Sequence, residues 1–369
     1  MGKNCKRVHR CNKQNGTQKL KLLVGGSHEK FFHLKEFTDE LQKLGNECRL
    51  VVDIDISTGF PSKKVSNWFQ TTKKFNKLVE EFKPDAVFVD RPGHFALAAL
   101  KAKLPLFIFL RGDYWSEIAW AKQTRYKHFP KNIIINKRDE IARICFEKCS
   151  SIITICEYLE KKGRIHYPDK KLLTMYQGID TSDWYESKGI KLKHPCVGLL
   201  QGAVIWGKTQ EMLILPKVLE AMPDVTFYWV GDGPYREKIL SILSKYSNFK
   251  WLGSMQYPDK VREYLSEIDV YALVSGIDMS PLTLQEAQLM SKPVVSTRVG
   301  GIPEIMKDGE TGFLVEKGGA QGWIDKLTIL VSDENKARHM GRTGREFVEK
   351  TFSWNIITKN FIDVTKQHV

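Results

Sequence analysis

Short apolar segments alternate with stretches of helical periodicity along most of the 369 residues, and this alternation runs through the chain twice. The apolar segments are continuous runs of Val, Ile, Leu and Phe, which is typical of strands covered by helices on both faces of a parallel sheet. Two such series predict an α/β protein with two Rossmann-like domains facing each other across a cleft. The predicted strands lie at 20–26, 48–55, 85–90, 105–113 and 150–157, and then at 196–202, 225–231, 249–253, 269–275, 292–301 and 312–316.

A polar, glycine-containing stretch at 178–195 separates the two series and has the composition of a linker. We expect an N-terminal domain at 21–190, a C-terminal domain at 191–352, and a last amphipathic helix at 353–369 that crosses back to the N-terminal domain. Residues 1–20 are rich in Lys and Arg, contain no acid and lack an apolar core. They predict a disordered basic arm rather than a secretory leader.

The formal net charge of +14 favours an anionic partner, which could be a nucleotide phosphate, an acidic membrane surface or a nucleic acid. The sequence contains no nucleic-acid recognition module, which argues against the last of these. The seven cysteines include no C-x-x-C pair, and their odd number fits a reducing compartment. No run is long enough to span a membrane. We therefore expect a cytoplasmic protein, either free or peripheral on the inner face of the membrane.

The segment "GAVIWGKT" at 202–209 matches the G-x-x-x-x-G-K-[ST] pattern of phosphate-binding P-loops. Three features argue against a true P-loop. Bulky side chains fill the variable positions, Pro216 interrupts the following helix, and no strand ending in a Mg²⁺-binding Asp follows. A P-loop phosphotransferase remains the alternative function. In either case Lys208, presented at a strand end after the flexible Gly202, is a candidate for binding a diphosphate.

A helix that begins after the predicted strand 269–275 offers a second anion site. Ser280 is a natural N-cap and Pro281 a natural first helical residue. Asp278 precedes the helix, and Glu286 lies about 7.5 Å along its axis. A nucleotide sugar could span this arrangement, with one carboxylate on the ribose and one on the sugar; the alternative is an exposed loop acid and a helix-surface acid. Its diphosphate would meet the free N–H groups at the helix start, around Leu282, Thr283 and Leu284.

The segment "GIDMSPLTLQEAQLMSKPVVSTRVGGIPEIMKDGETGFLV" resembles the retaining glycosyltransferases of family 4, which have the GT-B fold. The family's E-x7-E motif is matched by Asp278 and Glu286. The resemblance implies that Glu286 holds the ribose hydroxyls and Asp278 those of the donor sugar. The family's G-R-x-x-x-x-K loop is matched at Gly202 and Lys208. Further donor-side residues implied by the resemblance are Gly25, Gly26, Gly231 and Met255.

Three positions depart from the family pattern. Asp278 is one methylene shorter than the family's Glu. Ala203 stands where the family has Arg, which leaves more of the diphosphate charge to Lys208 and the helix. Arg111 replaces the His of the family's His-Gly pair, so it is a candidate for binding an anionic acceptor or the donor phosphate, with Asp113 orienting an acceptor hydroxyl. A structural Arg–Asp pair is the alternative for these two residues.

Together these features predict an enzyme that moves a hexose-type sugar from a UDP-, GDP- or ADP-sugar to a glycan, lipid-linked or small-molecule acceptor, with retention of anomeric configuration. The resemblance implies no tightly bound cofactor and no essential metal, and we interpret "DID" at 53–55 as strand-end acids. A GT-B sugar-nucleotide epimerase is a further alternative.

We expect the acceptor to bind the N-terminal domain, whose predicted helix at 63–82 combines lysines with three aromatic side chains. These aromatics either face an anionic membrane or pack on the sheet while the lysines stay in solvent. We favour packing for all three, which are Trp68, Phe69 and Phe75.

Overall fold

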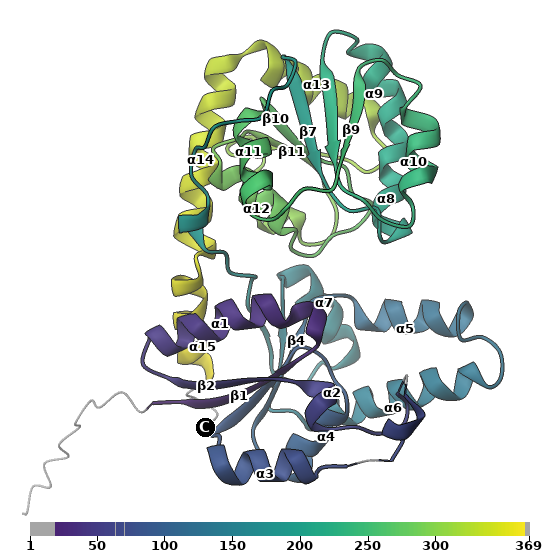
Figure 1. The fold of residues 1–369 in the computed structure, drawn as a ribbon, viewed down its shortest axis with the longest axis vertical. Coiled ribbons are helices and arrows are strands. Elements are labelled where there is room, and N and C mark those ends of the chain that lie inside the picture. The colour runs from purple at the N-terminus through teal and green to yellow at the C-terminus, as the bar shows by residue number, and fades with distance from the viewer. Residues whose placement is uncertain (1–18, 63, 70, 366–369) are drawn as a thin grey trace, which may run out of the picture.

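The computed structural model describes residues 19–62, 64–69 and 71–365, and it shows two α/β domains stacked along the long axis of the molecule (Figure 1). Each domain contains one six-stranded sheet, in which neighbouring strands pair in parallel. The prediction of two Rossmann-like units is therefore confirmed. The basic arm predicted at 1–20 falls almost entirely outside the described residues.

The two sheets differ in strand order. The first has the order β2-β1-β3-β4-β5-β6 and the second β12-β11-β10-β7-β8-β9, which is the Rossmann dinucleotide-binding order. The first sheet consists of β1 (Lys21–Gly26), β2 (Glu47–Val52), β3 (Ala86–Val89), β4 (Leu106–Leu110), β5 (Ser151–Thr154) and β6 (Leu172–Thr174). The second consists of β7 (Cys196–Leu200), β8 (Thr226–Val230), β9 (Phe249–Gly253), β10 (Val270–Leu273), β11 (Val294–Thr297) and β12 (Gly312–Val315).

Helices cover both sheets, as the continuous apolar strands require. Those of the first domain are α1 (Phe31–Lys43), α2 (Asp53–Ile56), α3 (Lys73–Phe82), α4 (His94–Lys101), α5 (Tyr114–Gln123), α6 (Lys131–Lys148) and α7 (Glu157–His166). Those of the second are α8 (Trp206–Thr209), α9 (Leu215–Ala221), α10 (Arg236–Leu243), α11 (Asp259–Glu267), α12 (Leu282–Leu289), α13 (Ala320–Ser332) and α14 (Glu334–Phe352). No helix among the described residues is long and apolar enough to cross a membrane.

The last helix, α15 (Trp354–Thr365), returns to the first domain, as predicted (Figure 1). Its buried side chains Trp354, Ile357 and Phe361 join the core under the first sheet. The ring of Phe361 lies 5.1 Å from that of Phe37 on α1, in an edge-to-face contact. This aromatic packing fixes the point where the chain crosses between the domains.

Three local predictions in the N-terminal domain were wrong. The helix predicted at 63–82 begins only at Lys73, because Thr58 and Thr71 form an antiparallel bridge that folds the preceding segment into a loop. Phe75 is buried as expected, but Trp68 and Phe69 are 43% and 83% exposed and do not pack on the sheet. The strand predicted to reach residue 55 ends at Val52, and "DID" begins the short helix α2.

Candidate functional site

Lys208 and Asp278 meet where β7 and β10 end. Lys208 lies in α8 and Asp278 in the loop before α12, 70 residues apart in sequence, yet Lys208 Nζ is 2.8 Å from Asp278 Oδ1. The two loops are tied together because Gly276 N–H donates to the carbonyl oxygen of Lys208 at 2.9 Å. The Asp278 side chain is only 13% exposed, so it is not an isolated loop acid.

The N-terminus of α12 lies next to Asp278, but the helix begins one residue later than predicted. Pro281 is the N-cap residue rather than the first helical residue, because its extended ψ of 113° keeps it outside the helix. The hydroxyl of Ser280 caps nothing and is buried with no partner among the described residues. Leu284 N–H donates back to Pro281, whereas those of Leu282 and Thr283 meet no acceptor in the described part of the chain. These two backbone donors at the start of α12 therefore suit an anion.

Glu286 is buried in the second turn of α12, with 3% of its surface exposed, which rules out a helix-surface acid. Its pKa is raised to about 8, chiefly because the carboxyl group is buried; a hydrogen bond from the hydroxyl of Tyr257 lowers the pKa, and the nearby carboxylate of Glu36 on α1 raises it. A carboxyl group held in this way can accept or donate hydrogen bonds to a polar ligand near neutral pH.

Arg111 and Asp113 have partners within the N-terminal domain, but they do not pair with each other. Arg111 Nε donates to Asp90 at 2.8 Å, and a second guanidinium nitrogen donates to Gln177 at 2.6 Å. Asp113 is the N-cap of α5 and accepts hydrogen bonds from the N–H of Ser116 at 3.1 Å and its hydroxyl at 2.6 Å. These hydrogen bonds explain the positions of both side chains without a ligand.

The predicted glycines lie at strand ends and mainly permit close packing. Gly26 ends β1, where an added Cβ would come within 2.0 Å of the Leu34 side chain. Gly231 follows β8 with a φ of 153°, and a Cβ there would come within 2.0 Å of a backbone oxygen. Gly25 also lies in β1, Gly202 follows β7, and Met255 is half-buried in the loop after β9.

The segment 202–209 does not form a phosphate cradle. The N–H groups of Lys208 and Thr209 both donate to the carbonyl oxygen of Ile205 at 3.0 Å. The Thr209 hydroxyl, which would bind Mg²⁺ in a P-loop, is buried and donates to that same oxygen at 3.0 Å. This geometry argues against a P-loop phosphotransferase.

Two residues at the junction of the domains were missed by sequence reasoning. Tyr257 bonds Glu286, and its ring contacts that of Phe32 on α1 at 6.4 Å. Glu304 accepts hydrogen bonds from the N–H groups of Glu157 and Tyr158 at 2.6 and 2.7 Å, so a carboxylate of one domain caps helix α7 of the other. Glu304 stands in the family-like segment, but nothing in the sequence reveals a partner 147 residues away.

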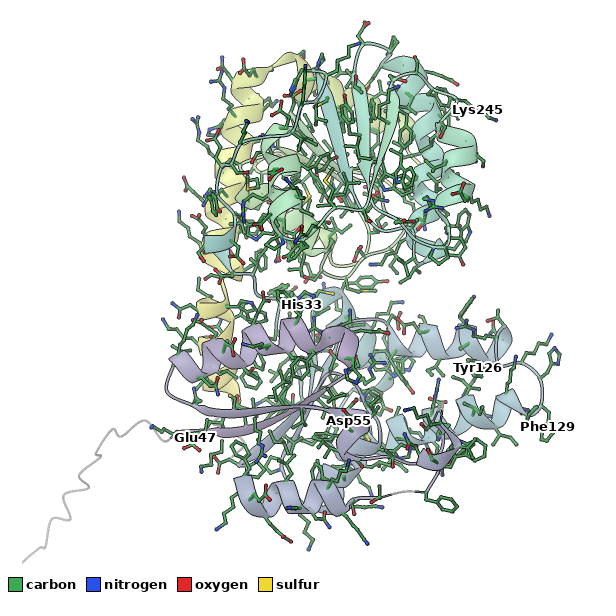
Figure 2. The ribbon with its side chains drawn as sticks, in the orientation of Figure 1. His33, Glu47, Asp55, Tyr126, Phe129 and Lys245 are labelled. Atoms are coloured by element: carbon green, nitrogen blue, oxygen red, sulfur yellow. The ribbon has the colours of Figure 1, made fainter. Side chains whose placement is uncertain are left out.

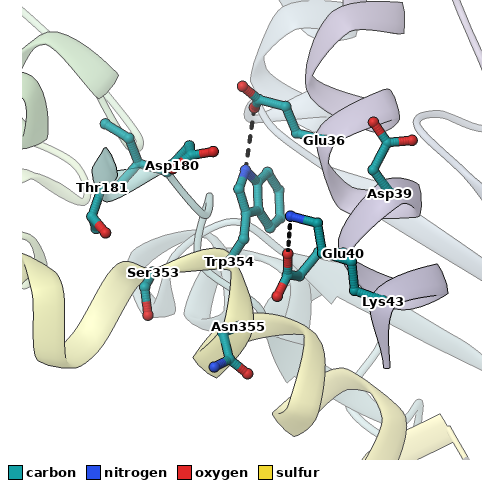
Figure 3. A pocket seen from close by; sticks show the side chains of 10 residues that line it. Glu36, Asp39, Glu40, Lys43, Asp180, Thr181, Ser353, Trp354 and Asn355 are labelled. Atoms are coloured by element: carbon teal, nitrogen blue, oxygen red, sulfur yellow. Dashed lines mark hydrogen bonds and ion pairs between the residues drawn. The ribbon is translucent and has the colours of Figure 1, made fainter. Parts of the chain in front are cut away.

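A cavity of about 230 Å³ lies where α1 meets the two segments that cross between the domains (Figure 3). Trp354 Nε1 donates to Glu36 at 3.2 Å at its edge. Because Glu36 also raises the pKa of Glu286, it lies near both this cavity and the α12 site.

Part of the C-terminal domain matches a known protein family. Residues 202–333 match the family described as Glycosyl transferases group 1. A GDP-mannose-dependent monoacylated alpha-(1-6)-phosphatidylinositol monomannoside mannosyltransferase of Corynebacterium glutamicum is 30% identical over 167 residues, 42% of this chain and 43% of that protein. The chain spans only 30% to 55% of the length of the first curated relatives it matches.

Solved structures share the whole architecture. Sucrose-phosphate synthase from Thermosynechococcus elongatus superimposes with a TM-score of 0.72 at 14% identity, covering 95% of this chain and 99% of that one. The Anabaena protein HepE, solved in complex with UDP, gives a TM-score of 0.69 at 16% identity, covering 94% and 100%. The chain therefore has the predicted GT-B fold, and residues 202–333 of its C-terminal domain are similar to the glycosyl transferases group 1 family.

Proposed function

We propose that this protein transfers a hexose-type sugar from a nucleotide-diphosphate sugar to a glycan, lipid-linked or small-molecule acceptor, with retention of anomeric configuration. The observation that carries the proposal is the ion pair of Lys208 and Asp278 beside two N–H groups at the start of α12 that meet no acceptor among the described residues, with Glu286 buried in the same helix. A cation, a helix N-terminus and two carboxyl groups suit a sugar joined to a nucleoside by a diphosphate.

Each residue has a distinct proposed part. Lys208 and the N–H groups of Leu282 and Thr283 neutralise the diphosphate, on which negative charge grows as the glycosidic bond breaks. Glu286 binds the ribose hydroxyls, and Asp278 binds hydroxyls of the donor sugar. Binding of the diphosphate would draw Lys208 away from Asp278, which frees that carboxylate for the sugar.

Retention is consistent with attack of the acceptor on the face that the diphosphate leaves. The acceptor oxygen forms the new bond to the anomeric carbon, the bond to the diphosphate oxygen breaks, and the departing phosphate takes the acceptor proton. This route needs no enzymic base, so it does not require Arg111 or Asp113 to titrate. Because Lys208 and α12 supply the positive charge, we propose that added Mg²⁺ or Mn²⁺ does not raise the rate.

One relative is named for GDP-mannose and one structural neighbour holds UDP, so a panel of donors distinguishes the base and the sugar. Thermal unfolding with a panel of UDP-, GDP- and ADP-sugars, followed by transfer assays, tests the proposal. We expect one donor to raise the unfolding temperature and to be consumed only with an acceptor. Consumption at the same rate without acceptor would favour the epimerase, and stabilisation by no sugar nucleotide would falsify the proposal.

We also propose that the N-terminal domain rests on an anionic membrane surface at the cytoplasmic face. The α5–α6 hairpin projects from this domain, with Phe129 near its tip (Figures 1 and 2). Phe129 is 78% exposed and Trp120 on α5 is 63% exposed, and basic residues outnumber acids along 122–148. Exposed aromatics among cations suit a charged lipid interface.

Co-sedimentation with vesicles tests this placement. We expect binding to vesicles that contain anionic lipid, weakened by Phe129→Ser and by high salt. The matched control is Ile165→Ser, which removes a 75% exposed apolar side chain from α7. Equal binding to neutral and anionic vesicles, or none to either, would remove the membrane from the proposal.

A further inference from the structure

A second cluster of chemically capable side chains lies at the opposite edge of the C-terminal sheet, where β7 and β10 begin. His194, Cys196 and Asp269 each present one ligand atom, and the three atoms lie within 4.8 Å of one another. His194 Nδ1 is 3.7 Å from Cys196 Sγ and 2.9 Å from the nearer oxygen of Asp269. The proposed donor site lies at the other ends of these strands, so the cluster plays no part in the proposed reaction.

The surrounding contacts orient each member of the cluster. His194 Nε2 lies 3.0 Å from the carboxylate of Glu267, which fixes the ring and leaves Nδ1 facing the other two groups. Asp269 Oδ2 accepts the backbone N–H of Cys196 at 2.7 Å. A metal-binding imidazole almost always donates its second N–H to a carboxylate, a backbone carbonyl or water, and Glu267 supplies a carboxylate here. The cluster therefore has a set of three ligands together with an outer partner that holds one of them.

We propose that His194, Cys196 and Asp269 bind a zinc ion, with water at the fourth position. A thiolate and an imidazole favour Zn²⁺ over Mg²⁺ or Ca²⁺, which prefer oxygen ligands. With bonds of about 2.3 Å to sulfur and about 2.0 Å to nitrogen, tetrahedral zinc needs these two atoms about 3.5 Å apart, close to the 3.7 Å seen. The Asp269 oxygen, 2.9 Å from His194 Nδ1, needs to move away from that nitrogen by a few tenths of an ångström.

When zinc binds, its ligands release protons, and this release balances the reaction. The Cys196 thiol loses its proton on forming the Zn–S bond, and His194 Nδ1 gives up any proton it shares with Asp269, so that its lone pair faces the metal. The nitrogen Nε2 keeps its proton and donates it to Glu267. No electron is transferred, because Zn²⁺ has no redox chemistry in proteins.

The position of the cluster indicates a structural role. His194 lies one residue before the end of the segment that links the two domains, Cys196 begins β7, and Asp269 immediately precedes β10. An ion held by all three would join the linker to two central strands of the second sheet. This inference goes beyond the proposed function and can be tested independently of it.

Titration with Co²⁺, a spectroscopic substitute for Zn²⁺, tests the site directly. The chain also has Cys5 and Cys11 in its basic arm, so the full-length protein carries Cys5→Ser and Cys11→Ser in every sample. We expect a thiolate-to-cobalt charge-transfer band that saturates at one equivalent and disappears when Zn²⁺ is added. The band should be lost in Cys196→Ala and retained in the matched control Cys149→Ala, which removes another buried free cysteine.

Further variants keep the proposal testable if Cys196→Ala does not fold. His194 is exposed, so His194→Ala should fold and lose the band. Glu267→Gln should keep the band but weaken Zn²⁺ affinity about 10- to 100-fold, as expected for an outer partner. A band that survives both Cys196→Ala and His194→Ala, or no band together with no Zn²⁺-induced rise in unfolding temperature, would overturn the site.

Discussion

The carboxyl ends of the two sheets bear similar kinds of side chain but use them differently. In the C-terminal domain Lys208 pairs with Asp278 beside the start of α12, where two N–H donors meet no acceptor in the described part of the chain, and Glu286 is buried in the same helix. In the N-terminal domain Arg111 and Asp113 are bonded to neighbouring protein groups. The comparison indicates that the polar groups of the proposed donor side are already assembled, whereas those of the proposed acceptor side shape the backbone.

Strand-end position alone therefore does not identify a ligand-binding residue. Open α/β sheets bind ligands outside the carboxyl ends of their strands, and the candidates on both sheets satisfy that rule. What separates them is whether the polar atoms already have partners in the folded chain. Three experiments would break or sharpen this distinction.

The largest effect is expected from Lys208→Ala. Removing one preorganised group that stabilises the departing diphosphate should lower kcat/KM about 10²- to 10³-fold, measured by steady-state sugar transfer. Lys238→Ala is the matched control, because Lys238 Nζ lies 3.6 Å from the centre of the Trp206 ring in the same region and is not paired with Asp278. Equal losses in the two variants would show that only general positive charge matters.

An intermediate effect is expected in the pH dependence of folding stability. Because burial raises the pKa of Glu286 from 4.5 to about 8, the folded protein keeps a proton between these pH values that the unfolded chain has lost. Its contribution to stability is therefore greatest at low pH and falls as pH rises toward 8. Glu286→Gln should remove a slope of up to about 1.4 kcal/mol per pH unit.

Denaturant unfolding at pH 6, 7 and 8 measures this slope. Glu310→Gln, which changes an exposed acid, should leave the wild-type slope in place. If Glu286→Gln also left it in place, the carboxyl group would titrate normally and the site would be wetter than its burial indicates.

The smallest effect is expected from Asp113→Ala on the acceptor side. Loss of the α5 N-cap should lower the free energy of unfolding by about 1 kcal/mol, whereas Asp113→Asn should keep most of the cap. Thermal unfolding and transfer kinetics are compared for both variants. A stable Asp113→Asn protein with a large loss of kcat would show instead that the carboxylate orients an acceptor hydroxyl.

Much of the architecture could be predicted because it follows from local pattern. Continuous apolar runs identified the two parallel sheets, and the return of the last helix was confirmed. The errors lie where the backbone conformation departs locally from the one that the side-chain pattern predicts. The bridge between Thr58 and Thr71 replaced the start of a predicted helix, and Pro281 adopted an extended ψ that moved the α12 cap by one residue.

The candidate site also contains residues that the sequence predicted and residues that only the structure revealed. The sequence singled out Lys208, Asp278 and Glu286 from spacing and resemblance, and the structure places Lys208 against Asp278. The sequence could not indicate that Tyr257 would bond Glu286 or that Glu304 would cap a helix of the other domain. No periodic pattern links positions so distant in the chain.

By itself, the order of residues determined most of the strands and helices, the two-domain architecture and the identity of the charged groups at the strand ends. Those features depend on side-chain periodicity and on turn chemistry over a few neighbouring residues. The tertiary structure decided which charged groups have partners, which are buried, and which domain supplies each partner. Such properties depend on distances between remote segments, and those distances exist only once the two sheets and the crossing helix have packed together.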